Sequence, residues 1–302
     1  MNYKTLLMAS AAVLFSTQAM AQDLTGEFSV PGKGQIMSDT TIGMTRTKTS
    51  KHTPGWGSVS MARDGLYAGE TLEYGITDNL SINGTIMNAF DRDITNDVYT
   101  HYAIGWDADK TYNNDHNFTY ALGAKYNMRF NDVLFQIAPT YTTWDPKSWF
   151  GHRYNDARWQ KNIGVDLKAG LDLGNGLTPY IVYHIDSDID TAHRELDQFV
   201  KVGVHKYAGK WALDGAIRYE WTKNHEDSYD WWGTVFKYNE KNTTETWFDA
   251  EADYYLKDNM ALGLYGSYLI DAHDRAYYGI ASSAKEHVNS DYEIGVRFKV
   301  LF

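Results

Sequence analysis

The chain ends in the stretch YEIGVRFKVLF, residues 292–302, which has the clearest pattern in the sequence. Every second side chain is aromatic or β-branched, from Tyr292 to Phe302. The side chains between them include Glu293, Arg297 and Lys299, with Leu301 the one apolar member. Successive side chains of a β-strand point to opposite faces of a sheet. This alternation therefore predicts a strand with one apolar face and one polar face.

The same alternation recurs inside the chain, at residues 118–130, 163–171 and 211–221. Such runs are longer than the roughly five or six residues usual for strands of soluble sheets. They match the roughly 9 to 11 residues that a tilted strand needs to cross a bilayer. The pattern therefore favours membrane-crossing strands.

Short turns rich in Asn, Asp and Gly separate pairs of these runs, at 78–79, 131–132, 175–176, 208–209 and 258–259. Asn, Asp and Gly tolerate the positive φ angles of tight hairpins. Ten turn-linked strands, one earlier strand at about 36–47 and the final strand predict twelve strands. The opposite connections are longer and polar, at roughly 48–64, 91–116, 144–159, 188–195, 223–244 and 272–290.

Two details leave the strand pattern open. Residues 101–106 also alternate, so ten or fourteen strands remain alternatives. Pro139 falls inside a predicted central strand. Because proline has no N–H to donate to a sheet ladder, we expect a bulge there.

The first residues, Met1 to Ala21, have the three parts of a secretory signal peptide. Lys4 precedes an apolar run from Leu6 to Phe15, and Ala19-Met20-Ala21 provides a small-x-small ending. The apolar run is about half the roughly 20 residues of a membrane-spanning helix. We therefore expect cleavage after Ala21, leaving residues 22–302 as a single mature domain.

Composition excludes several classes of protein. The 302 residues include 28 Lys and Arg against 39 Asp and Glu, a formal net charge of −11. An acidic surface does not suit a nucleic-acid-binding protein, which must replace the counterions around phosphates. The chain has no Cys, which excludes a disulfide scaffold, a thiol nucleophile and a cysteine-bound metal.

The signal peptide, the alternating strands and the C-terminal strand ending at Phe302 resemble those of Gram-negative outer-membrane β-barrel proteins. The resemblance covers nearly all of the mature chain, but it lies in pattern and not in a family-specific motif. It implies an all-β, antiparallel up-and-down barrel in the outer membrane, surrounded by outer-membrane lipid. It also implies that the barrel-assembly machinery recognises the last strand. Size and strand count are similar to those of the small twelve-stranded porins for acidic sugars and of nucleoside channels.

A secreted β-sandwich is the soluble alternative, because a buried face and a hydrated face produce the same alternation. Strand length and the terminal Phe302 argue against it. So do aromatic residues near strand ends, which suit the girdles at a membrane interface: Tyr126, Phe130, Tyr207, Trp211, Trp221, Trp247, Tyr254 and Phe298.

The polar faces of the strands would line the lumen, and acids outnumber bases on them. The predicted pore-lining residues are Lys125, Arg129, Asp166, Lys168, Asp214, Arg218, Asp249, Glu251, Asp253, Glu293 and Arg297. Asp249, Glu251 and Asp253 would form an acidic ladder along a cation-preferring path. In the alternative interpretation, inward acids pair with inward bases and brace a filled barrel. Strand register, which would separate the two, is not contained in the sequence.

The long connection after residue 144 carries the predicted recognition residues Trp149, Arg153 and Trp159. Aromatic planes beside cations suit sugar rings and carboxylates. The alternative is that these side chains pack against the rim or rest among lipid headgroups. Trp231-Trp232, in a later connection, has the same two interpretations. The acids of residues 186–190 resemble the start of a calcium loop but lack its later positions, so we expect a solvated loop.

These features together predict a porin-like channel through which small hydrophilic solutes diffuse passively, without a cofactor. A closed barrel that binds partners through its loops is the second interpretation. A hydrolase is the third. The one candidate general base for a hydrolase is His184, with Asp186 as its carboxylate partner two residues along the same strand. Neither HExxH nor Gly-x-Ser-x-Gly occurs in the sequence, and no catalytic residue is assigned.

Overall fold

The computed structural model describes residues 24–53, 57–98, 110–144, 160–189, 196–223, 226–231, 234–240, 243–272, 275–278 and 283–302. The expected signal peptide and the recognition residues Trp149, Arg153 and Trp159 lie outside these ranges, as do residues 101–106. Within the described ranges, no helix is long and apolar enough to cross a membrane.

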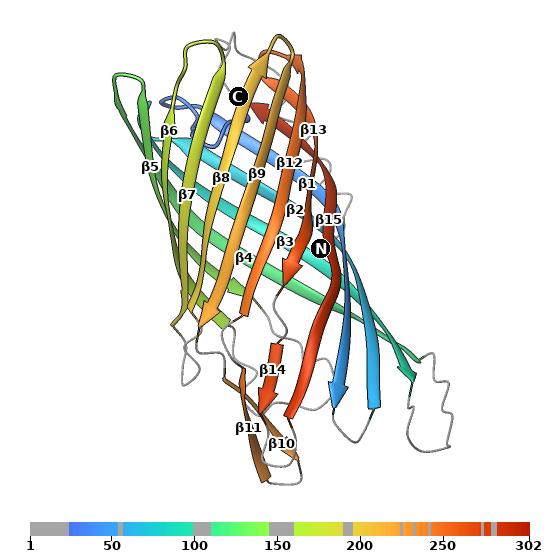
Figure 1. Ribbon diagram of the computed structural model, residues 1–302. Coiled ribbons are helices and arrows are strands. Elements are labelled where there is room, and N and C mark those ends of the chain that lie inside the picture. The colour runs from blue at the N-terminus through green and yellow to red at the C-terminus, as the bar shows by residue number, and fades with distance from the viewer. Residues whose placement is uncertain are drawn as a thin grey trace.

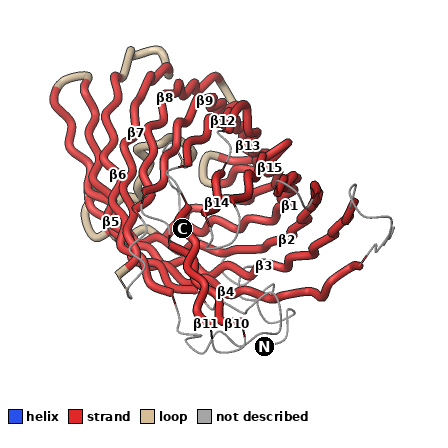
Figure 2. Tube along the Cα trace, turned by 60° about the horizontal axis from the view of Figure 1, so that its bottom comes forward, coloured by secondary structure: helices blue, strands red, loops and turns tan. Residues whose placement is uncertain are grey.

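Twelve strands of the described chain form one ring, each antiparallel to its neighbours (Figures 1 and 2). All are long, and the longest has 21 residues. In order round the ring they are β1 (Ile36–Thr53), β2 (Gly57–Gly75), β3 (Leu80–Val98), β4 (Lys110–Phe130), β5 (Val133–Trp144), β6 (Gln160–Leu171), β7 (Leu177–Asp188), β8 (Leu196–Ala208), β9 (Trp211–Lys223), β12 (Thr243–Lys257), β13 (Met260–Ala272) and β15 (Ser283–Leu301).

The ring closes where the last strand pairs with the first. The pairing of β1 with β15 runs from Met37 opposite Leu301 to His52 opposite Lys285. At its end, the backbone N–H of Phe302 donates to the carbonyl of Ile36 at 2.8 Å, and the N–H of Ile36 donates to the carbonyl of Phe302 at 3.1 Å. Closure removes both sheet edges, which a bilayer requires. The all-β, twelve-stranded barrel predicted from the sequence is confirmed.

The long connections contain more strand than the sequence analysis expected. β1 and β2 continue through most of the expected first loop, so that only residues 54–56 separate them. Three further strands, β10 (Glu226–Trp231), β11 (Thr234–Glu240) and β14 (Arg275–Tyr278), extend the sheet beyond the ring at the lower end of Figure 1. The expected loops at 223–244 and 272–290 are therefore partly β-structure.

The short turns lie at the opposite end of the barrel, at the positions predicted from the sequence. Asn131 has φ 55°, Gly176 φ 73° and Gly209 φ 65°, the left-handed region that Asn and Gly tolerate. The bulge expected at Pro139 is wrong. β5 keeps one register against both neighbours, and the ladder with β4 is interrupted between Gly123–Thr140 and Tyr126–Ile137. An interruption accommodates the missing N–H donor without an extra residue.

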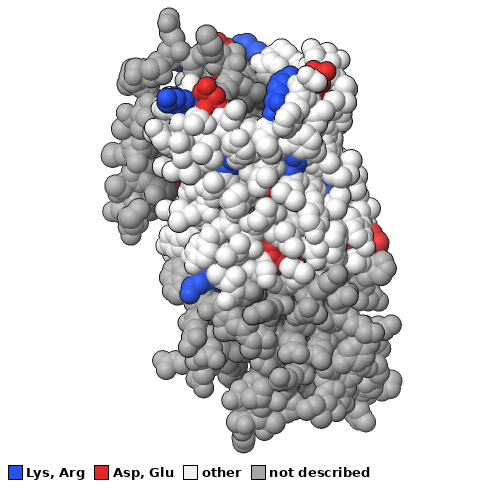
Figure 3. Space-filling model, turned by 90° about the vertical axis from the view of Figure 1, so that its left-hand side faces the viewer, with Lys and Arg blue, Asp and Glu red and all other residues white. Residues whose placement is uncertain are grey.

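The two faces of the wall differ as an outer-membrane barrel requires. The outer face exposes large apolar side chains, including Leu122 at 65% and Phe130 at 63%. Figure 3 shows few charged atoms across the middle of one side of the wall. A soluble protein buries such residues, whereas a barrel in lipid presents them outward. The soluble sandwich is therefore excluded.

Two of the aromatic residues expected at the membrane interface face inward. Tyr207 packs edge-on against the inward side chain of Tyr255, with ring centres 5.4 Å apart. The other is Trp247. Trp247 pairs with Arg218 in register, and the Arg218 guanidinium lies 5.2 Å from the centre of the indole ring. Arg218 belongs to the inward face of β9, so Trp247 lines the lumen. On the outer face, Trp211 packs against Tyr254 with ring centres 5.0 Å apart.

Candidate functional site in the barrel lumen

The described part of the chain before β1 enters the lumen at the end with the short turns. Residues 24–35 are called the N-terminal segment below. Leu24 is 1% exposed and packs with Tyr255, Met37 and Leu301. Its N–H donates to the Tyr255 hydroxyl at 2.9 Å, and its carbonyl accepts from the Lys299 ammonium at 3.2 Å. The segment is therefore held by the inner wall at its first described residue.

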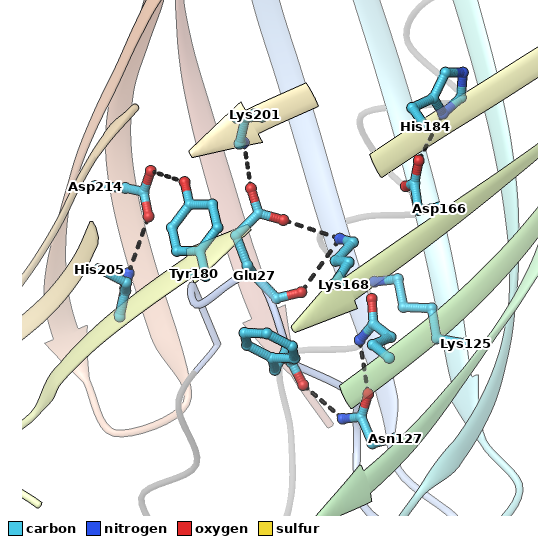
Figure 4. Close-up of polar contacts among 12 residues, drawn as sticks. Glu27, Lys125, Asn127, Asp166, Lys168, Tyr180, His184, Lys201, His205 and Asp214 are labelled. Carbon is cyan, nitrogen blue, oxygen red and sulfur yellow. Dashed lines mark hydrogen bonds and ion pairs between the residues drawn. The ribbon is translucent and has the colours of Figure 1, made fainter. Parts of the chain in front are cut away.

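Glu27 of the N-terminal segment makes charged contacts with two lysines of the wall (Figure 4). Lys168 of β6 donates to one of its carboxylate oxygens at 2.9 Å and to its backbone carbonyl at 3.2 Å. Lys201 of β8 donates to the other carboxylate oxygen. One carboxylate thus receives two ammonium groups from two strands.

The register of the wall explains this convergence. Lys168 lies opposite Val182 of β7, and Val182 lies opposite Lys201, so the two lysines share one row across the sheet. Burial alone raises the pKa of Glu27, but the attraction and hydrogen bonds of Lys168 and Lys201 outweigh it. The net result is a pKa lowered from 4.5 to about 2. Glu27 is therefore an anion throughout the neutral and mildly acidic range.

The Phe28 side chain packs the N-terminal segment against the wall beside this ion pair. It packs on the buried cluster of Tyr180, Val182 and Ala216. Its ring lies over Gly170, where a Cβ atom would come within 2.6 Å of it. The carbonyl of Phe28 accepts a hydrogen bond from Asn127 at 2.6 Å. The glycine therefore makes room for an aromatic ring inside the barrel.

A cavity of about 490 Å³ lies between the N-terminal segment and the wall. Glu27, Phe28 and Tyr180 are among the residues lining it, together with Asn127 and His205. The Tyr180 hydroxyl donates to Asp214 at 2.6 Å, and the other oxygen of Asp214 lies 3.6 Å from Nδ1 of His205. The cavity is thus lined by fixed polar groups next to an aromatic surface.

The predicted pore-lining residues lie on the inward face in ion pairs and hydrogen bonds. The pairs are Lys125 with Glu73 (2.7 Å), Arg129 with Asp172 (2.8 Å), Asp166 with His184 (2.6 Å), Arg218 with Asp249 (3.0 Å) and Glu220, and Arg297 with Asp253 (2.6 Å) and Glu251. Glu293 accepts a hydrogen bond from Tyr67, and Lys168 and Asp214 have the partners described above. The three acids of the proposed ladder therefore each have an arginine partner, which favours the bracing interpretation for that part of the wall.

His184 does not pair with Asp186 as the hydrolase interpretation required. It pairs with Asp166, which lies directly opposite on β6, and its ring stacks on Phe199 with centres 4.6 Å apart. Within the described ranges, no group of three or more His, Asp or Glu residues is arranged to hold a metal ion.

The sequence analysis missed the N-terminal segment. It assigned no element between the expected cleavage site and the first strand, and it gave Glu27 and Phe28 no role. Leu24, Phe28 and Val30 are apolar at spacings of four and two, which matches no strand period over a useful length. Tyr180 offered a weak signal, because it is an aromatic residue on the polar face of an alternating strand.

Comparison with known proteins supports the fold. No family model and no curated protein matches this sequence. Among solved structures, the chain is similar to a COG4313 outer membrane channel from Pseudomonas putida F1, with a TM-score of 0.55, 13% identity and coverage of 92% of this chain and 99% of that chain. It is also similar to the outer membrane protease OmpT from Escherichia coli, with a TM-score of 0.40, 9% identity and coverage of 91% and 99%. A third structure is the translocator domain of the autotransporter NalP from Neisseria meningitidis, with a TM-score of 0.44, 12% identity and coverage of 99% and 94%.

The closed ring, its apolar exterior and its polar interior define the class of this protein. It is an integral outer-membrane β-barrel. The first comparison agrees with that fold.

Proposed function

We propose that the protein is a channel through which small hydrophilic solutes diffuse passively across the outer membrane. One observation carries this proposal: the wall leaves room in the lumen for a stretch of polypeptide that includes the Phe28 ring. Eight-stranded barrels have interiors that side chains fill, and sixteen to eighteen strands leave a water-filled channel. This twelve-stranded wall has space beyond its own side chains, and a separate segment occupies part of it.

The polar lining supports the same function. Lys125, Asp166 and Arg218 lie on the inward face in ion pairs and keep 27%, 29% and 21% of their side chains exposed. A lining of fixed charges offers partners to a hydrated solute in place of water. Because acids and bases are both present, the proposed path is not restricted to one sign of charge.

The test is single-channel conductance of the refolded protein, residues 22–302, in a planar bilayer, with selectivity measured in a salt gradient. Because the N-terminal segment narrows the lumen, the Glu27→Gln variant is measured beside the wild type. We expect discrete conductance steps, more frequent in the variant. Silence from both proteins, with circular dichroism showing folded β-sheet, would overturn the channel proposal.

A closed barrel that binds partners through its loops is the second candidate. The ion pairs of Arg218 and Arg297 favour it, because these two arginines bind four carboxylates and so connect neighbouring strands of the wall. This candidate predicts silence in the same bilayer experiment. A single measurement therefore separates the two.

A further inference from the structure

The contacts of the Glu27 carboxylate resemble those of a ligand bound in a site. Both of its carboxylate oxygens accept hydrogen bonds from lysines, and the two lysines come from strands separated by β7. The carboxylate belongs to the N-terminal segment, which lies in the lumen, is not part of the wall and continues into β1 through residues 32–35. The wall alone therefore supplies the two cations, and the segment supplies the anion.

The two lysines are oriented by the wall. The Lys201 ammonium lies 5.5 Å from the centre of the Tyr180 ring, and the Tyr180 hydroxyl is fixed by Asp214. Lys168 is 11% exposed and Lys201 is 19% exposed in their side chains. Without Glu27, two ammonium groups would face each other in a confined space, which costs free energy unless another anion binds.

A cavity adjoins the site on the side of Glu27. The Glu27 side chain keeps 18% of its surface exposed and lines the 490 Å³ cavity. The cavity volume lies within the range of roughly 300 to 1,000 Å³ that small-molecule sites have. Phe28 and Tyr180 give the cavity apolar surface, and Asn127 gives it a polar group. These features suit a short carbon chain that ends in a carboxylate.

We propose that Lys168 and Lys201 form a binding site for small aliphatic carboxylates in the lumen, and that Glu27 occupies this site as an internal ligand. A solute carboxylate and Glu27 compete for the same two ammonium groups. Binding of the solute releases the N-terminal segment from the wall and widens the lumen. This inference rests on the proposed channel function for its role, and it identifies the class of solute.

The test measures binding separately from conductance. The probe is glutarate, titrated calorimetrically into the refolded protein in detergent, with the uncharged diamide of glutarate as the matched ligand. Four proteins are compared: the wild type, Glu27→Gln, Glu27→Gln with Lys168→Gln and Lys201→Gln, and Glu27→Gln with Lys206→Gln. Lys206 lies on β8 as Lys201 does, but it binds the carbonyl of Asn175 at the rim.

A tethered competitor acts at a high effective concentration, so we expect Glu27→Gln to bind glutarate at least about tenfold more tightly than the wild type. The variant without both lysines should lose that gain, and the Lys206 control should keep it. The diamide should bind none of the four. Equal affinity in the wild type and Glu27→Gln, or unchanged affinity after removal of both lysines, would overturn the proposed site.

Conductance then separates this inference from the channel proposal. Tight glutarate binding by a protein that never conducts would keep the site and overturn the channel. Conductance from a Glu27→Gln protein that binds glutarate no better than the wild type would keep the channel and overturn the site. If Glu27→Gln with both lysine substitutions does not fold, Glu27→Gln with Lys201→Gln alone serves, and it should lose most of the gain.

Discussion

Arg297 and Asp253 form an ion pair across an intervening strand. Arg297 belongs to β15 and Asp253 to β12, and Gly263 of β13 lies opposite both. The guanidinium donates to the two oxygens of the carboxylate at 3.1 and 2.6 Å. A Cβ atom at Gly263 would lie 1.7 Å from the nearer carboxylate oxygen. The pair therefore depends on the absence of a side chain between its members.

We predict that Gly263→Ala destabilises the barrel. The added methyl group must displace the buried Asp253 side chain, and overpacking of this kind costs about 1 to 3 kcal/mol. The measurement is the free energy of unfolding in urea, followed by tryptophan fluorescence in lipid vesicles. Gly215→Ala on β9 is the matched control, because nothing lies within 4 Å of the position of its Cβ. Equal stability of the two variants would contradict the prediction.

We predict that Arg218→Gln makes the proposed channel more cation-selective. Arg218 balances Asp249, at 3.0 Å, and Glu220 in the lumen. Its removal leaves two carboxylates without that partner, and the permeability ratio of K⁺ to Cl⁻ should rise about twofold or more. Reversal potentials in a KCl gradient measure this ratio, with Lys206→Gln as the control. An unchanged ratio would place the conducting path away from Arg218.

The parts of the barrel that follow local rules were predictable from the sequence. Alternation with a period of two located the last strand, and Asn131, Gly176 and Gly209 marked turns that need positive φ. The closing partner of the last strand follows from antiparallel order. Each of these features depends on neighbours within a few residues or on simple strand order.

The contents of the lumen were not predictable, because they depend on contacts between distant residues. Leu24 binds Tyr255, 231 residues away, and no local pattern records that contact. His184 was matched to Asp186 along its own strand, whereas register places Asp166 directly opposite it. The N-terminal segment has no regular period, so it carried no signal for its place inside the wall.

We predict that Phe302→Ala strongly lowers the amount of folded barrel in cells but changes the free energy of unfolding of the refolded protein only slightly. The bonds that close the seam use the backbone of Phe302 and Ile36, which alanine retains. The refolded variant should therefore differ in unfolding free energy by less than about 1 kcal/mol. If the assembly machinery recognises the terminal aromatic ring, the heat-modifiable band in outer-membrane fractions should fall several-fold. A fall in the free energy of unfolding by several kcal/mol would assign the ring a structural role instead.

We predict that acid releases the N-terminal segment only at low pH. The pKa of Glu27 is lowered from 4.5 to about 2, because Lys168 and Lys201 favour its charged form over the cost of its burial. The bound segment therefore holds fewer protons at Glu27 than the released segment does. Its stabilisation is fully present above pH 4.5 and is lost as the pH falls towards 2. This shift corresponds to a stabilisation on the order of 3 kcal/mol.

A spin label at Ser29→Cys reports this release, because the chain has no other cysteine and Ser29 lines the cavity beside Glu27. We expect an immobilised spectrum at pH 5 and a mobile one near pH 2, with circular dichroism confirming that the barrel stays folded. The Glu27→Gln variant should lack this transition, because it has no carboxylate to protonate there. A transition with the same midpoint in both proteins would assign the release to groups other than Glu27.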